Sequence, residues 1–62
     1  MMTEIYLKYL DESYFFNFTD NVMIVEYPNE TGSRVIKYMK REEMLSTIDY
    51  LEANGATVIA RN

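Results

Sequence analysis

The side chains that could perform chemistry in this 62-residue chain are few, and their types limit what they can do. There is no histidine and no cysteine, which excludes disulfide bonds, thiolate or imidazole metal ligands, and a histidine that activates a serine. Acidic residues stand side by side at Asp11–Glu12 and at Glu42–Glu43. Such neighbours diverge in direction, whereas glycosidase-type chemistry needs two opposed carboxylates. We therefore expect no enzymatic activity.

The length of the chain and the spacing of its acids also argue against a cofactor or metal site. A ligand cleft usually measures at least about 300 Å³, and a domain this small is expected to lack the volume for one. Asp11, Glu12 and Asp20 do not follow the spacing of an EF-hand loop. The sequence therefore predicts binding rather than catalysis, with no cofactor.

The aromatic run Tyr14-Phe15-Phe16-Asn17-Phe18 is the most informative segment. Successive side chains of a β-strand point to opposite faces, so this run is aromatic on both. A chain of this size buries only about 60% of the surface that its unfolded state exposes, and it has little protein to cover both faces. Either Phe16 and Phe18 point into the core and a loop half-covers Phe15, or Phe15 and its neighbours lie in an interface. We favour the interface.

The hydrophobic pattern predicts five strands and one helix. Residues 4–10 alternate, with Ile5, Leu7 and Tyr9 on one face. The run at 22–27 is almost continuously apolar, which indicates a strand inside the sheet. The other expected segments are strands at 14–18, 34–39 and 56–61, turns at 11–13 and 19–21, and a loop at 28–33.

A helix is predicted at about residues 40–54. Met44, Ile48 and Leu51 recur at helical spacing, and Gly55 is placed to end the helix. The expected fold is a single α+β domain over residues 1–62, with an antiparallel sheet of four to five strands and one helix packed on one face, in the order β-β-β-β-α-β.

One helix can cover only one face of such a sheet. The other face would carry a share of Tyr6, of the aromatic run and of the 22–27 strand. Exposed apolar patches of more than a few hundred Å² usually mark an interaction site. On the helix itself, Tyr50 is expected to point outward, either shielding the sheet edge or serving as a second contact, since tyrosine is enriched at hot spots.

Charge is distributed unevenly along the chain, whose net charge is −4. Residues 1–33 hold six acids against Lys8 alone and carry −5, whereas residues 34–62 carry +1. An acidic region repels phosphate backbones and attracts basic protein surfaces, so we expect no direct nucleic-acid binding. Asp11, Glu12 and Asp20 fall on predicted loops, where they serve either as solvated surface or as a row of carboxylates facing a basic groove.

Membrane and export signals are not expected in this sequence. No apolar run approaches the roughly 18 residues of a membrane span, and the start of the chain lacks the basic and apolar regions of a signal peptide. We therefore expect a cytoplasmic protein without membrane contact.

In length, acidity, aromatic content and lack of catalytic residues, the chain resembles small bacteriophage and mobile-element inhibitors, such as anti-CRISPR proteins and uracil-DNA glycosylase inhibitors. Glu12-Ser13 before apolar residues is similar to the acidic strand opening of the glycosylase inhibitors. The resemblance is one of composition, and no motif accompanies it. It implies a protein that occupies a nucleic-acid-binding or regulatory surface of a host enzyme.

Two functions remain open at this point. The first is an inhibitor or adaptor that binds a basic surface of a host protein and acts by steric and electrostatic occlusion. The second is a structural or regulatory homodimer that buries the aromatic sheet face. The candidate partner-binding residues are Asp11, Glu12, Tyr14, Phe15, Phe16, Phe18, Asp20 and Tyr50.

Overall fold

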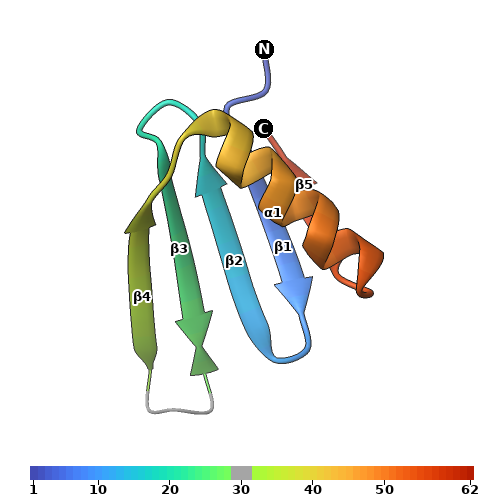
Figure 1. The fold of residues 1–62 in the computed structure, drawn as a ribbon. Coiled ribbons are helices and arrows are strands. Elements are labelled where there is room, and N and C mark those ends of the chain that lie inside the picture. Colours follow the sequence, from blue (N-terminus) through green and yellow to red (C-terminus); the bar gives the residue numbers. More distant parts are fainter. Residues whose placement is uncertain (29–31) are drawn as a thin grey trace.

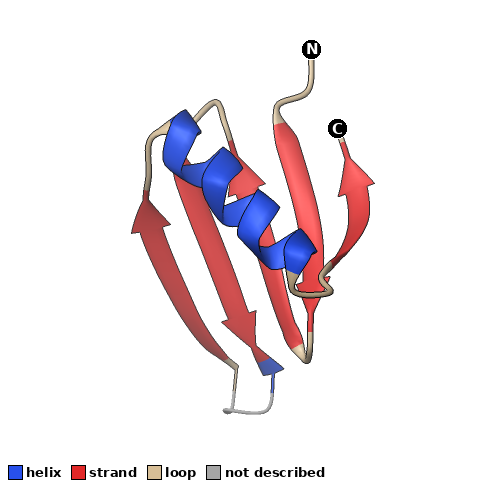
Figure 2. Ribbon diagram, turned by 45° about the vertical axis from the view of Figure 1, so that its right-hand side comes forward, coloured by secondary structure: helices blue, strands red, loops and turns tan. Residues whose placement is uncertain are grey.

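In the part of the chain that the structure describes, five antiparallel strands form one sheet, and a single helix lies across one of its faces (Figures 1 and 2). The computed structural model describes residues 1–28 and 32–62. Its elements are β1 (Glu4–Tyr9), β2 (Glu12–Asn17), β3 (Val22–Tyr27), β4 (Ser33–Tyr38), α1 (Arg41–Ala53) and β5 (Thr57–Arg61). The strand order β4-β3-β2-β1-β5 confirms the α+β prediction and places β3 inside the sheet. Part of the loop predicted at 28–33, residues 29–31, lies outside the described residues.

The β1–β2 hairpin is tighter than predicted. Its turn consists of Leu10 and Asp11, and Tyr9 pairs directly with Glu12. Glu12 and Ser13 therefore belong to β2, which corrects the turn expected at 11–13. The pairing register fixes this assignment of Glu12 and Ser13, because a one-residue slip would move every apolar side chain of β2 to the other face of the sheet. Leu10 adopts a φ of 55° to close the turn, a left-handed conformation that costs roughly 1–2 kcal/mol.

The β2–β3 connection is a polar turn, as predicted at 19–21. The side-chain oxygen of Asn17 accepts hydrogen bonds from the backbone N–H groups of Thr19 (2.9 Å) and Asp20 (3.0 Å). This arrangement is an Asx-turn, which satisfies backbone donors that the ladder no longer pairs. The strand therefore ends at Asn17, one residue earlier than expected.

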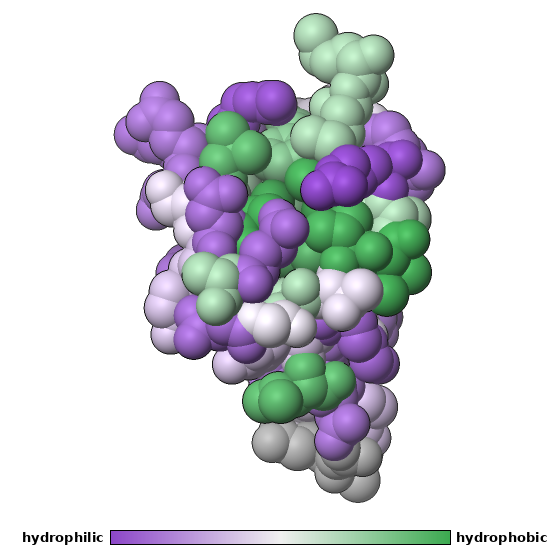
Figure 3. Space-filling view, turned by 90° about the vertical axis from the view of Figure 1, so that its right-hand side faces the viewer, coloured by the Kyte–Doolittle hydropathy of each residue, from purple (hydrophilic) through white to green (hydrophobic). Residues whose placement is uncertain are grey.

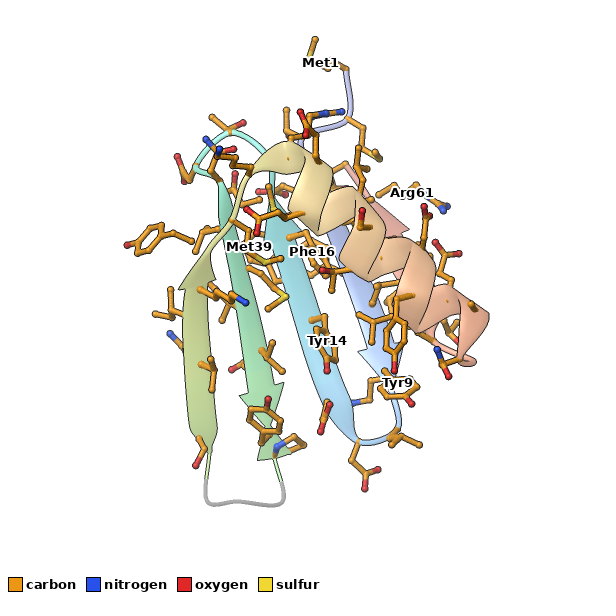
Figure 4. All side chains as sticks on the ribbon, in the orientation of Figure 1. Met1, Tyr9, Tyr14, Phe16, Met39 and Arg61 are labelled. Atoms are coloured by element: carbon orange, nitrogen blue, oxygen red, sulfur yellow. The ribbon has the colours of Figure 1, made fainter. Side chains whose placement is uncertain are left out.

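The core lies between the sheet and α1. Phe16 is fully buried beneath the helix (Figure 4), and the guanidinium of Arg41 lies 4.7 Å from the ring centroid of Phe18. The helix contributes the three residues that the sequence spacing predicted, Met44, Ile48 and Leu51. The core cluster consists of Ile5, Leu7, Phe16, Phe18, Met23, Val25, Met39, Met44, Ile48 and Leu51.

Both ends of α1 are capped. The Glu43 carboxylate accepts a hydrogen bond from the backbone N–H of Lys40, the N-cap residue, at 3.1 Å. At the other end Gly55 has a φ of 99°, and the N–H of Ala56 donates to the carbonyl of Leu51 at 2.9 Å. Together with the bond from Gly55 to Glu52 (3.1 Å), this is a Schellman motif. No helix in the described part of the chain is long and apolar enough to cross a membrane.

Candidate interaction surface

A row of apolar side chains crosses the sheet face that α1 leaves uncovered. Tyr6 pairs with Phe15, Phe15 with Ile24, and Ile24 with Ile36, so residues from four neighbouring strands lie side by side. Ile59 of β5 borders the same face beside Tyr6 and Phe15. We call Tyr6, Phe15, Ile24, Ile36 and Ile59 the apolar row.

The apolar row is open to solvent along much of its length. Tyr6 is 37% exposed, Ile36 54% and Ile59 63%, while Phe15 and Ile24 are partly exposed. The rings of Tyr6 and Phe15 lie with their centroids 4.6 Å apart and their planes tilted by 32°. Neighbouring aromatic side chains of this kind are rigid and supply a large contact area, which makes them suitable anchors for a partner.

An open concavity of about 500 Å³ adjoins the row on the β5 side. Its lining includes Tyr6, Phe15 and Ile59, with Lys8 and Ser13 at its polar border. The expectation that a chain of this length has no room for a cleft is therefore wrong. Figure 3, which faces the β5 side of the molecule, shows hydrophobic surface bordered by polar residues.

A polar row runs parallel to the apolar row on the same face. Lys8, Ser13, Glu26 and Arg34 are successive cross-strand partners. The Lys8 ammonium donates to the Ser13 hydroxyl at 3.4 Å, and Arg34 lies 3.8 Å from the Glu26 carboxylate. Because Arg34 and Glu26 are more than half exposed, this ion pair contributes at most about 1 kcal/mol. An apolar centre with a polar border is the usual anatomy of a protein–protein interface.

The predicted aromatic run divides between the two faces of the sheet. Phe15 lies on the helix-free face, in the middle of the apolar row. Phe16 is 0% exposed and Phe18 is 9% exposed, so both belong to the core. Their predicted role as partner contacts is therefore corrected. The alternation of side chains along the strand, together with the position of α1, places the even-numbered members of the run on the helix side.

Tyr14 also faces the helix side, where it is partly buried and engaged with Glu12. Its hydroxyl donates to the Glu12 carboxylate at 2.8 Å. Burial, and then the hydrogen bond to Glu12 and its negative charge, raise the pKa of Tyr14 above the usual value for tyrosine. Tyr9 and Tyr27 lie close enough to add to this shift. The Tyr14–Glu12 contact supports β2 from the helix side and is not part of the helix-free face.

The acidic residues do not form one row. Asp11 lies in the β1–β2 turn and Asp20 in the β2–β3 turn, at opposite ends of β2 (Figure 1). Consecutive turns of an antiparallel meander must alternate between the two ends of the sheet, so this carboxylate row could not form. Tyr50 is 67% exposed, but it lies on α1, on the opposite side of the sheet from Phe15.

Ile36 and Ile59 were not predicted as site residues, although they form both ends of the apolar row. Ile36 can be identified from the strand register. Phe15 pairs with Ile24 and Ile24 pairs with Ile36, so both isoleucines continue the row that begins at Tyr6. Ile59 follows a register shift in the β1–β5 pairing, which falls between Tyr6 and Leu7. The shift leaves Ile59 without a direct partner on β1 and has no clear sequence signal.

Comparisons with protein-family models, with curated proteins and with solved structures find no match for this chain.

Proposed function

We propose that the chain is a non-enzymatic protein-binding module that uses its helix-free face. The observation that carries this proposal is the apolar row, which is exposed in the middle of a sheet whose other face is covered by α1. A partner that covers the row would bury the aromatic anchors Tyr6 and Phe15. Its own side chains would enter the adjoining concavity.

The mechanism we propose is occlusion of a partner surface. Burial of the apolar row supplies affinity, and the net charge of −4 favours approach to a basic surface. The compositional resemblance to phage-type inhibitors supports a host defence enzyme or a nucleic-acid enzyme as the partner, with action of the anti-CRISPR kind. In this proposal the attraction to a basic surface comes from the net charge of the whole molecule and not from a local row of carboxylates, because Asp11 and Asp20 lie at opposite ends of the sheet.

A homodimer that buries the helix-free face is the second candidate. The same apolar row favours it, since two copies stacked face to face would cover each other's Tyr6 and Phe15. Light scattering on the wild type and on Tyr6→Lys separates the two candidates, because a face-to-face dimer would dissociate when a lysine enters the apolar row.

The test of the first candidate is a quantitative pull-down from a bacterial lysate with two matched variants. Tyr6→Lys and Tyr50→Lys make the same substitution at exposed tyrosines on opposite sides of the sheet. We expect a protein captured by the wild type to be retained by Tyr50→Lys and lost with Tyr6→Lys, with both variants folded by circular dichroism. Loss with Tyr50→Lys and retention with Tyr6→Lys would place the binding surface on the helix side.

A further inference from the structure

The two edges of the sheet differ in their readiness to pair with another strand. β5 has five residues and is joined to β1 through a register shift. β4 has six residues, all exposed, and pairs with β3 in unbroken register. α1 lies away from β4, and no described element covers its outer side (Figures 1 and 2). A regular, uncovered edge strand is a template for strand addition.

The free hydrogen-bonding groups of β4 can be assigned from its ladder with β3. The N–H of Met39 donates to the carbonyl of Asn21 at 2.9 Å, so these opposed residues form a hydrogen-bonded pair. Pairs of this kind alternate along an antiparallel ladder. Val35 and Lys37 therefore bond to β3. Arg34, Ile36 and Tyr38 point their N–H and C=O groups away from the sheet.

We propose that two copies of this chain pair antiparallel through β4, with Ile36 opposite Ile36 of the second copy. The outward groups lie only on even-numbered residues, so a ladder requires even-numbered residues to face each other. The register centred on Ile36 brings all three outward residues of each strand into hydrogen-bonded pairs. Arg34 of each copy then lies opposite Tyr38 of the other.

The side chains favour this register over its neighbours. A register centred on Arg34 or on Lys37 would place like charges directly opposite each other, which is destabilising. A register centred on Val35 leaves Tyr38 outside the paired outward residues, so fewer hydrogen bonds form. The register centred on Ile36 opposes two apolar side chains and sets the Arg34 guanidinium beside the Tyr38 ring, a favourable cation–π arrangement.

This pairing would make the two helix-free faces continuous, because the twofold axis stands perpendicular to the sheet. The two apolar rows would meet at Ile36 and double in length. The proposal does not depend on the proposed function, since it concerns the purified chain alone. It differs from a face-to-face dimer, which would cover the rows instead of joining them.

The first measurement is light scattering on the purified chain over a concentration series. We expect a dimer that becomes monomeric with Ile36→Lys, which sets two cations opposite each other, and that persists with Ile59→Lys. Ile36 and Ile59 are both more than half exposed on the same face, so the two variants are matched. A wild-type monomer up to millimolar concentration would overturn the proposal. Loss of the dimer in both variants would instead indicate face-to-face burial.

The second measurement tests the register through cysteines, which the natural chain lacks. In the proposed pair the Cα atoms of the two Ile36 residues are about 5.5 Å apart, within disulfide range. Those of the two Val35 residues are diagonal neighbours, about 7–8 Å apart. We therefore expect Ile36→Cys to form a covalent dimer on mild oxidation much faster than Val35→Cys. Faster cross-linking of Val35→Cys would overturn the register.

Discussion

Phe15 and Phe16 are neighbours in the sequence and have opposite roles in the fold. Phe16 is fully buried beneath α1, whereas Phe15 lies partly exposed in the apolar row. Sequence alone shows that one of two adjacent strand residues faces each side. It does not show which side the helix covers, so the place of Phe16 and Phe18 in the core, and not among the partner contacts, follows only from the structure.

The two phenylalanines provide a matched pair of substitutions. Phe16→Ala removes a ring from the core and should lower the free energy of unfolding by about 3–5 kcal/mol, which a domain of this size can barely tolerate. Phe15→Ala removes a partly exposed ring and should cost about 1–2 kcal/mol. Urea denaturation followed by circular dichroism measures both. Equal losses would mean that the helix-free face is as well covered as the core.

The raised pKa of Tyr14 predicts that the folded state loses stability at alkaline pH. In the unfolded chain a tyrosine releases its proton near pH 10, but burial and Glu12 raise the pKa of Tyr14 in the folded state. The unfolded state then binds fewer protons, so stability is complete below about pH 10 and declines as the pH rises further. Tyr14→Phe should cost about 1 kcal/mol at neutral pH through the lost hydrogen bond, and its stability should fall less steeply above pH 10. Denaturation curves at a series of pH values would show this, and parallel pH profiles would contradict it.

At the scale of elements, the helix was predictable because two independent signals agree. The spacing of Met44, Ile48 and Leu51 defined its buried side, and Gly55 marked its end. The turn between β1 and β2 was less predictable. Asp11, Glu12 and Ser13 have the composition of a turn. The register of the apolar residues instead places Glu12 and Ser13 in the β1–β2 pairing and leaves Asp11 in the turn with Leu10.

The buried side of α1 can be tested by two charges. Ile48 is 4% exposed, so Ile48→Asp places an unpaired carboxylate against the core and should unfold the domain. Ser46 is exposed on the same helix, and Ser46→Asp should keep the wild-type fold. Thermal melts followed by circular dichroism give the comparison. A cooperative melt of Ile48→Asp would show that this side of the helix is not in the core.

At the scale of the whole molecule, the predicted split between a covered and an uncovered sheet face is present in the structure. The membership of the exposed face was only partly predictable. Tyr6 and Phe15 follow from strand alternation, but Ile36 requires the register of three successive hairpins and Ile59 follows a register shift. The alternative of a single carboxylate row fails for a topological reason, since consecutive turns of a meander point to opposite ends of the sheet.

The overall charge predicts weak affinity for nucleic acids. Six basic residues are interspersed with ten acids, so the chain has too few clustered cations to neutralise phosphates. We expect no shift of duplex or single-stranded DNA or RNA in electrophoresis at physiological salt. Micromolar binding that weakens steeply with added salt would contradict the electrostatic account.

The helix-free face is the centre of this account, and the dissociation constant of a captured partner tests it most directly. The measurement compares the wild type with Phe15→Ala, in the apolar row, and with Tyr50→Ala, an equally aromatic truncation on the helix side. We expect Phe15→Ala to weaken binding by about 30-fold or more, which corresponds to roughly 2 kcal/mol, and Tyr50→Ala to leave it unchanged. A folded Phe15→Ala variant that binds like the wild type, beside a Tyr50→Ala variant that does not, would contradict the account.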